Sequence, residues 1–220
     1  SEFGVVMAHH RIPAPERTGP SAREPRRPKA DSGDNLRARF DTARPAATEG
    51  ELWAAPAAVQ DVRCALSWVK ANAKTYGFDA RRVVPYGTSA GGHLALMAGM
   101  LPKDNDIDLP ACRDQPTVPA ILDFYGPYHL RSNLPGAFKS PSTARWIGGG
   151  PETLWTTMAP ATYVRAGLPP VFIVHGDADP TVPYEASLAL KADLDKAGVP
   201  NRFHSVAGGV HGKFPKEEQD

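Results

Sequence analysis

The sequence has no long apolar run, no excess of charge of either sign and only two cysteines. A transmembrane helix needs about 20 mainly apolar residues in succession. Because the chain contains no such run, we expect no membrane span. The net charge of +1 gives no electrostatic reason to expect binding to nucleic acid or to an anionic membrane. The function is therefore expected to need neither of these partners.

The two cysteines, Cys64 and Cys112, are too few for a disulfide-stapled scaffold. Cys64 lies in a segment whose apolar residues recur at spacings of three and four, which is typical of an amphipathic helix. We expect two unpaired, partly buried thiols, and a disulfide between them stays open because spacing alone does not decide pairing. No secretory leader is recognisable, so a cytoplasmic and a secreted location are both open.

The length of 220 residues suits one domain, and 41% hydrophobic residues are enough for a sizeable core. Residues 14–50 differ from the rest because arginine, proline and alanine dominate them, and Leu36 and Phe40 are their only large apolar residues. Such a segment buries too little apolar surface to offset its ordering entropy. We therefore expect a residual N-terminal strand in 1–13, an irregular or disordered insertion at 14–50 and the main domain at 51–220.

Within the main domain, short β-prone segments alternate with segments of helical periodicity. Strands are expected at 82–86, 121–125, 171–174 and 202–206, and helices at 57–73, 92–98 and 184–197. A loop rich in glycine, proline and serine is expected at 126–151. The alternation predicts an α/β fold with a mostly parallel sheet flanked by helices.

Residues 87–91 read Gly-Thr-Ser-Ala-Gly and carry the strongest functional signal. The pattern G-x-S-x-G, after a short strand and before an apolar helix, is typical of a tight turn that presents a reactive serine. Small residues at the glycine positions let the strand and helix backbones approach each other. The start of the following helix favours negative charge. The pattern predicts that Ser89 is a nucleophile, although a buried serine in a glycine-rich turn is the plainer alternative.

A serine hydroxyl needs a base to take its proton, and histidine has a suitable pKa. A carboxylate then orients the imidazole and stabilises its charged form. In the α/β-hydrolase order these groups follow one another as serine, acid and histidine. The chain offers that order as Ser89, Asp179 and His211.

Each partner of Ser89 has competitors. Both Asp177 and Asp179 follow the apolar run at 171–174, and either is also a plausible turn former before a proline. Among the histidines, His211 is preferred because it lies in a glycine-flanked loop after the last strand, where catalytic groups are common. The competing histidines lie on expected strands or a helix, where packing or bracing roles are commoner; they are His93, His175 and His204.

Three blocks of the sequence carry a resemblance to a known family: the segments from 56 to 95 around the serine turn, residues 169–183 (PPVFIVHGDADPTVP) and residues 208–212 (GGVHG). In combination they resemble the α/β-hydrolase serine esterases that include hormone-sensitive-lipase-like, acetyl-xylan and feruloyl esterases. The resemblance runs from about residue 56 almost to the C-terminus. It implies the α/β-hydrolase fold for 51–220, lacking the first strands, and it favours Asp179 over Asp177 as the acid.

The resemblance also shows two departures. The family carries a His-Gly-Gly motif before the nucleophile, whose N–H groups form half of the oxyanion hole. Here His9 and His10 are followed by Arg11, so only the other donor, the backbone N–H of Ala90, is expected. The sequence stops at 216–220, where the family continues into a closing helix. We therefore expect a trimmed hydrolase domain and a poor catalyst, since loss of one such donor costs about 100- to 1000-fold in rate.

Together these features predict a carboxylesterase-type serine hydrolase that works through an acyl-enzyme with Ser89, Asp179 and His211. The expected substrate is a small-molecule or polysaccharide-linked ester, with no cofactor and no metal. A peptidase or amidase of the same fold and a catalytically weak, hydrolase-like binding protein are the alternatives. Acyl and alcohol specificity and oligomeric state are not fixed by the sequence.

Overall fold

The computed structural model describes residues 3–7, 54–130, 136–138, 141–147 and 152–214. The strands are β1 (Phe3–Met7), β2 (Val83–Thr88), β3 (Ile121–Phe124), β4 (Val171–Gly176) and β5 (Asn201–Val206). The α-helices are α2 (Ala54–Tyr76), α3 (Ala90–Met100), α4 (Pro141–Ile147), α5 (Glu152–Thr157) and α6 (Tyr184–Lys196). Short 3-10 turns lie at η1 (Ala80–Arg82), η2 (Pro110–Cys112) and η3 (Pro160–Tyr163).

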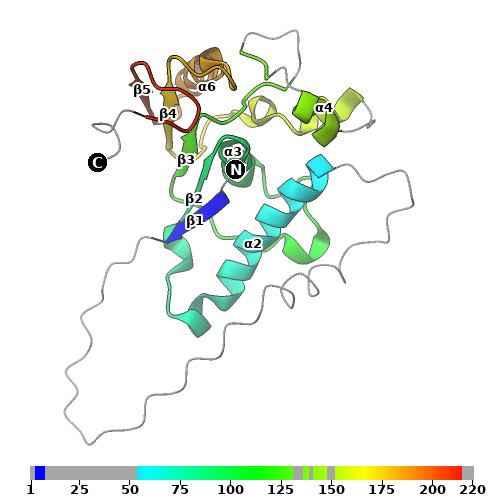
Figure 1. Cartoon of the computed structure of the whole chain (residues 1–220). Helices are drawn as coiled ribbons and strands as arrows, with labels where there is room; N and C mark the ends of the chain where they lie inside the picture. Colours follow the sequence, from blue (N-terminus) through cyan, green and yellow to red (C-terminus); the bar gives the residue numbers. More distant parts are fainter. Residues whose placement is uncertain (1–2, 8–53, 131–135, 139–140, 148–151, 215–220) are drawn as a thin grey trace, which may run out of the picture. The chain divides into compact units, whose positions relative to one another are not determined.

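The described strands form one sheet in the order β1-β2-β3-β4-β5 (Figure 1). Strands β2 to β5 run parallel, and β1 pairs antiparallel with β2. The expected α/β fold with a mostly parallel sheet is confirmed. In such a sheet the carboxyl ends of the parallel strands meet at one edge, where functional loops gather.

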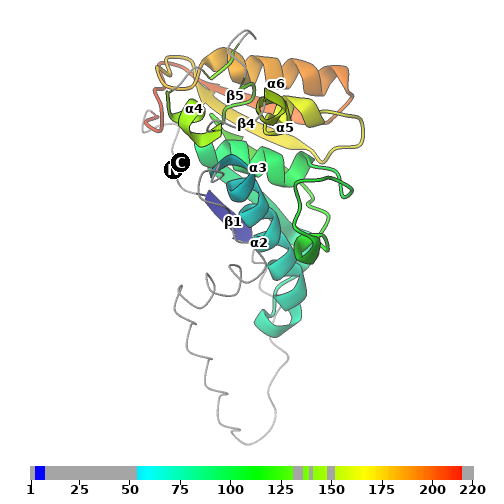
Figure 2. The ribbon, with the colours of Figure 1, turned by 90° about the vertical axis from the view of Figure 1, so that its right-hand side faces the viewer.

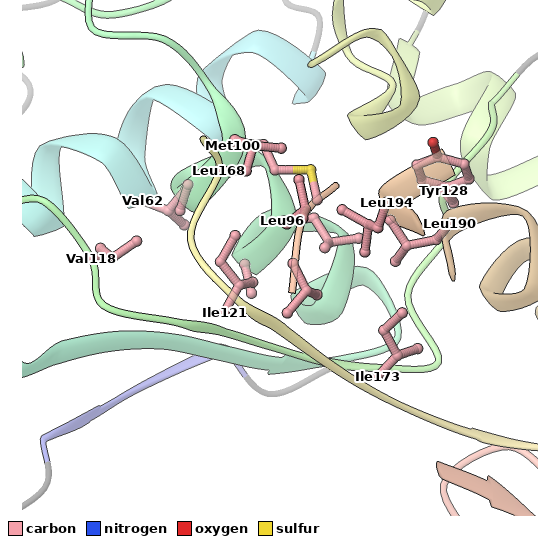
Figure 3. Packing of buried hydrophobic residues seen from close by; sticks show 14 of the residues in the cluster. Val62, Leu96, Met100, Val118, Ile121, Tyr128, Leu168, Ile173, Leu190 and Leu194 are labelled. Carbon is pink, nitrogen blue, oxygen red and sulfur yellow. The ribbon is translucent and has the colours of Figure 1, made fainter. Parts of the chain in front are cut away.

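The core lies between the sheet and helices α2, α3 and α6 (Figure 2). Figure 3 shows Leu96 of α3, Ile121 of β3, Ile173 of β4 and Leu190 and Leu194 of α6 packed together. All five are fully buried. Because all three helices contribute to this one cluster, they pack against the same face of the sheet.

Helix α2 is tethered to the loop after α3 by two further links. Cys64 and Cys112 form a disulfide with Cα atoms 4.7 Å apart, which replaces the expected pair of free thiols. The neighbouring Arg63 is buried and donates to the carboxylate of Asp108 and to the carbonyl of Ala98 near the end of α3. The sequence could not predict the disulfide, because η2 folds back onto α2 only through tertiary packing.

The expected loop at 126–151 was wrong in one part, because α4 lies within it. Ile147 is fully buried in a second apolar cluster with Val59 of α2 and Met97 of α3. A helix this short is marginal by local propensity, so packing rather than sequence pattern fixes it. The insertion expected at 14–50 lies outside the described residues and stays a prediction, as do the domain boundaries drawn around it.

Candidate active site

Ser89 occupies the turn between β2 and α3. Its backbone angles of φ 55° and ψ −123° lie where residues with a side chain are strained. The turn is so tight that a Cβ atom at Gly87 would collide with the carbonyl group of Gly91. The Ser89 N–H donates to the carbonyl of Phe124 at 2.9 Å, which ties the turn to the end of β3. The geometry is that of a strained strand-turn-helix, as the G-x-S-x-G pattern predicts.

The structure brings Ser89, His211 and Asp179 together from three separate loops. His211 Nε2 lies 2.8 Å from Ser89 Oγ, and His211 Nδ1 lies 2.7 Å from Asp179 Oδ2. The side chain of Asp179 is 1% exposed and that of His211 is 23% exposed. Since β2, β4 and β5 are parallel, the loops that follow them meet at one edge of the sheet.

Asp177 and Asp179 have different partners. Oδ1 of Asp179 accepts hydrogen bonds from the N–H groups of Thr181 (2.7 Å) and Val182 (3.0 Å), leaving Oδ2 toward His211. Asp177 is exposed and accepts from the N–H of Gly208 at 2.7 Å. Asp177 therefore braces the backbone of the loop that carries His211, whereas Asp179 contacts its imidazole.

The competing histidines lie elsewhere. His204 sits on β5, in register with Val174 of β4. His93 is buried in α3, where its Nδ1 lies 3.1 Å from the carbonyl oxygen of Pro127. His175 lies at the end of β4, against Asp179 rather than Ser89. Among the described residues, the histidine whose ring lies within hydrogen-bond distance of Ser89 is thus His211.

Tyr125 is a neighbour of the site that no sequence pattern indicated. It follows β3 with a positive φ of 46°, and its N–H donates to the carbonyl of Val174 at 2.8 Å. Its ring meets the imidazole of His211 edge-on, with centroids 4.9 Å apart, and also contacts Phe214 at 5.6 Å. Tyr125 therefore forms an aromatic wall beside the imidazole.

Two buried titratable groups lie around the start of α3. Burial raises the pKa of Asp123 to about 7, although its Oδ1 accepts a hydrogen bond from the Gly126 N–H at 3.1 Å. Burial lowers the pKa of His93 to about 4, so its imidazole is neutral at neutral pH. The second polar atom of each, Asp123 Oδ2 and His93 Nε2, has no hydrogen-bond partner among the described residues.

A pocket of about 250 Å³ opens beside Ala90, the residue after Ser89. Its walls are mainly apolar and come from α3, from the segment after β3 and from α4; they are Ala90, His93, Leu94, Pro127, Leu130, Phe138, Thr143 and Trp146. Trp146 meets the ring of His93 edge-on at 5.0 Å. The pocket offers an apolar group of a ligand a place next to the serine.

The acidic, cysteine and histidine side chains of the described residues form no metal site. In that part of the chain, no three or more His, Cys, Asp or Glu side chains gather as a metal ion would require. No helix of the described ranges has the length and apolar character needed to cross a bilayer. The expectation of a cofactor-free mechanism stays a prediction.

Comparison with known proteins assigns the chain to a family. Residues 49–194 match the family model BD-FAE. The chain belongs to the BD-FAE family. The match contains Ser89 and Asp179, whereas His211 lies beyond it.

Named relatives of this BD-FAE chain are esterases. Esterase LipQ of Mycobacterium tuberculosis is 30% identical over 166 residues, which cover 72% of the chain and 39% of LipQ. A truncated carbohydrate esterase from gut microbiota has a TM-score of 0.59 and 32% identity, over 70% of the chain and 61% of that protein. Thermogutta terrifontis esterase 2, solved phosphonylated by cyclosarin, has a TM-score of 0.59 and 30% identity, over 72% of the chain and 55% of that protein.

The predicted resemblance to α/β-hydrolase esterases is therefore confirmed at the level of family and fold. The chain spans well under half the length of LipQ and a little over half of each of the two solved structures. What those whole proteins do passes to this chain only as a proposal.

Proposed function

We propose that the protein is a serine carboxylic-ester hydrolase that works through an acyl-enzyme, with Ser89 as nucleophile, His211 as base and Asp179 as acid. The observation that carries the proposal is the hydrogen-bonded series Asp179–His211–Ser89, with contacts of 2.7 Å and 2.8 Å. Distances of this size are short enough for direct proton transfer.

The protonation states follow from the partners. A carboxylate only accepts hydrogen bonds. His211 Nδ1 therefore carries the ring proton, and this N–H donates a hydrogen bond to Asp179. The lone pair on His211 Nε2 then faces Ser89 Oγ and accepts from its hydroxyl. As Oγ attacks the ester carbonyl carbon, its proton moves to Nε2. The imidazolium formed is stabilised by the negative charge of Asp179.

The attack places negative charge on the former carbonyl oxygen, next to the first turn of α3. We assign the Ala90 N–H as one donor to that oxygen, aided by the partial positive charge at the start of this helix. His211 then returns its proton to the leaving alcohol, and the C–O bond to the alcohol breaks. A water molecule repeats the sequence on the acyl-enzyme, releasing the acid and free Ser89.

The second donor to this oxygen was expected to be missing, and we expect any backbone group that replaces it to come from residues after Val6. Those beyond Met7, up to residue 53, lie outside the described part of the chain. The expected low rate and its origin in a missing donor therefore stay predictions. They are tested by the change in kcat/KM when a His-Gly-Gly strand and loop is added, with a gain of about 100-fold expected.

The pocket beside Ala90 supports an ester with a compact apolar group on one side of the scissile bond. Its apolar walls would bury that group, while the carboxyl end of the sheet leaves Ser89 accessible to the rest of the substrate. Both a small-molecule ester and an ester attached to a polysaccharide meet this requirement.

Covalent labelling with a fluorophosphonate, followed by mapping of the modified residue, tests the nucleophile. We expect label on Ser89 and none on the Ser89→Ala variant, which should fold normally. Full labelling of Ser89→Ala would overturn the assignment. Thermogutta terrifontis esterase 2, solved phosphonylated by cyclosarin, shows that a structural neighbour reacts with this class of reagent.

The two aspartates provide a matched pair for the acid. Asp179→Asn should lower kcat by about 10⁴-fold, because the amide cannot hold the imidazole in the productive tautomer. Asp177→Asn should have a milder effect, since Asp177 contacts only backbone of the histidine loop. The reverse ranking would show that the wrong carboxylate was assigned.

Parallel assays with a p-nitrophenyl ester and the matching anilide separate the candidate functions. Turnover of the ester alone supports the esterase. Turnover of the anilide would point to an amidase, and the absence of both turnover and labelling would point to a binding protein.

A further inference from the structure

A second histidine lies against the carboxylate of Asp179. His175 Nε2 is 3.3 Å from Asp179 Oδ2 and 3.1 Å from the carbonyl oxygen of Val182. On the other side of the ring, His175 Nδ1 is 2.7 Å from Ser187 Oγ on α6. His175 is 0% exposed and Ser187 is 1% exposed. The pair is therefore closed off from solvent and meets the carboxylate of Asp179 from the protein interior.

The partners of His175 fix where its proton lies. Both groups near Nε2 accept hydrogen bonds, so Nε2 must carry the ring proton. The hydroxyl of Ser187 can donate, so it supplies the hydrogen bond to Nδ1. Burial lowers the pKa of His175, against the opposing pull of Asp179. The ring is therefore neutral and presents a single N–H to Asp179 and Val182.

We propose that His175, oriented by Ser187, is a positioning residue that holds Asp179 Oδ2 in place for His211. The proposal rests on the proposed function, in which Asp179 orients the imidazole of His211. Oδ1 is already held by the N–H groups of Thr181 and Val182. With His175 on Oδ2 as well, the carboxylate cannot rotate without losing several hydrogen bonds at once.

Ser187 and His175 repeat the residue types of Ser89 and His211 on the other side of Asp179. Ser187 is not a second nucleophile, because it is almost completely buried and no substrate carbonyl could reach it. Its hydroxyl instead complements the tautomer of His175 in which Nε2 carries the proton, because it can donate to the bare Nδ1. The two Ser–His pairs therefore share one carboxylate but perform different tasks.

The N–H of His175 also offsets part of the negative charge of the carboxylate, because Nε2 lies 3.3 Å from Oδ2. The other groups that face His175 are Tyr125 and Tyr184, whose rings lie 6.3 Å and 5.7 Å away. A phenol carries no charge near neutral pH, so the charge that His175 senses comes from Asp179 and His211.

The kinetic test compares His175→Leu with His175→Gln in the full chain. The leucine variant removes the donor, whereas the glutamine amide keeps an N–H near the position of Nε2. We expect His175→Leu to lower kcat by about 10- to 100-fold. KM should change little, because the side chain at position 175 does not touch substrate. His175→Gln should restore most of the lost kcat.

Loss of folded protein alone would lower the number of titratable active serines without lowering the rate per active serine. Rates are therefore expressed per serine titrated with a fluorophosphonate. An unchanged kcat in His175→Leu would overturn the proposal, as would equal losses in the leucine and glutamine variants. Ser187→Ala should give a smaller loss than His175→Leu, and a larger loss would contradict the assigned order.

A measurement without turnover separates this proposal from the proposed function. Nitrogen NMR of the wild-type histidine rings should show His175 with a protonated Nε2 and a bare Nδ1 near neutral pH. A protonated Nδ1 or a doubly protonated ring would overturn the proposal even in an active esterase. If the protein has no esterase activity, the kinetic arm fails together with the proposed function, whereas the tautomer still reports whether His175 donates toward Asp179.

Discussion

Replacement of Asp123 by asparagine should remove a loss of stability that the protein suffers as the pH rises from about 4 to about 8. Asp123 is 0% exposed, and burial raises its pKa from 3.8 to about 7. Below both values the carboxyl group is protonated in the folded and the unfolded chain, so its stability contribution is complete. As the pH rises between them, the unfolded chain releases this proton while the folded protein retains it. The free energy of unfolding therefore falls across this window.

The size of the effect follows from the two pKa values. Each unit of difference corresponds to about 1.36 kcal/mol, so a rise from 3.8 to about 7 gives a loss of about 4 kcal/mol. The asparagine side chain cannot ionise, and its oxygen can still accept the hydrogen bond from the Gly126 N–H. The Asp123→Asn variant should therefore gain about 4 kcal/mol over the wild type between about pH 4 and about pH 8. For a chain of this length that is about 10 °C in Tm.

Urea unfolding of both proteins across this pH range measures the difference directly. His93 also titrates here, with its pKa lowered to about 4, and it costs stability as the pH falls. Because both proteins contain His93, its contribution cancels in the difference. Asp104→Asn, at an exposed carboxyl, is the control and should show no such trend. A difference between Asp123→Asn and wild type that stays flat with pH, or that falls as the pH rises, would refute the reasoning.

Three further outcomes are expected. Replacement of both Cys64 and Cys112 by alanine should lower the free energy of unfolding by about 4 kcal/mol, because the disulfide closes a separation of 48 residues; urea unfolding with and without reductant measures it. Tyr128→Phe should cost about 1 to 3 kcal/mol in the same assay, because its buried hydroxyl donates to Asp193 at 2.6 Å. Trp146→Ala should enlarge the pocket and shift kcat/KM toward p-nitrophenyl esters with longer acyl chains, and an unchanged chain-length profile would place the acyl group elsewhere.

The sequence predicted most of the α/β fold and named three loops that the structure brings together. The serine turn has strong local rules, since only glycine fits at position 87 against the Gly91 carbonyl. The loops of Asp179 and His211 follow parallel strands, so their convergence follows from topology alone. Local pattern did not separate Asp177 from Asp179, because the difference lies in which carboxylate the turn directs toward the imidazole.

Other parts of the site depend on contacts that no local pattern encodes. His175 reads as the end of a buried strand, and only the fold places Ser187 on one side of its ring and Asp179 on the other. Helix α4, which supplies Trp146 to the pocket, lies in a stretch rich in glycine, proline and serine. Its position is set by burial of Ile147, a tertiary effect that overrides the local preference for a loop.

The distribution of backbone strain gives these observations a common physical basis. Among the described residues, Ser89 and Tyr125 are the non-glycine residues with positive φ, at 55° and 46°. They directly follow the adjacent parallel strands β2 and β3, and the Ser89 N–H donates to the carbonyl of Phe124, the residue before Tyr125. Such conformations cost about 1 to 3 kcal/mol each and persist only where the surroundings fix them. One strained turn presents the hydroxyl and the other presents the ring that flanks His211, so both strained positions border the same imidazole–serine pair.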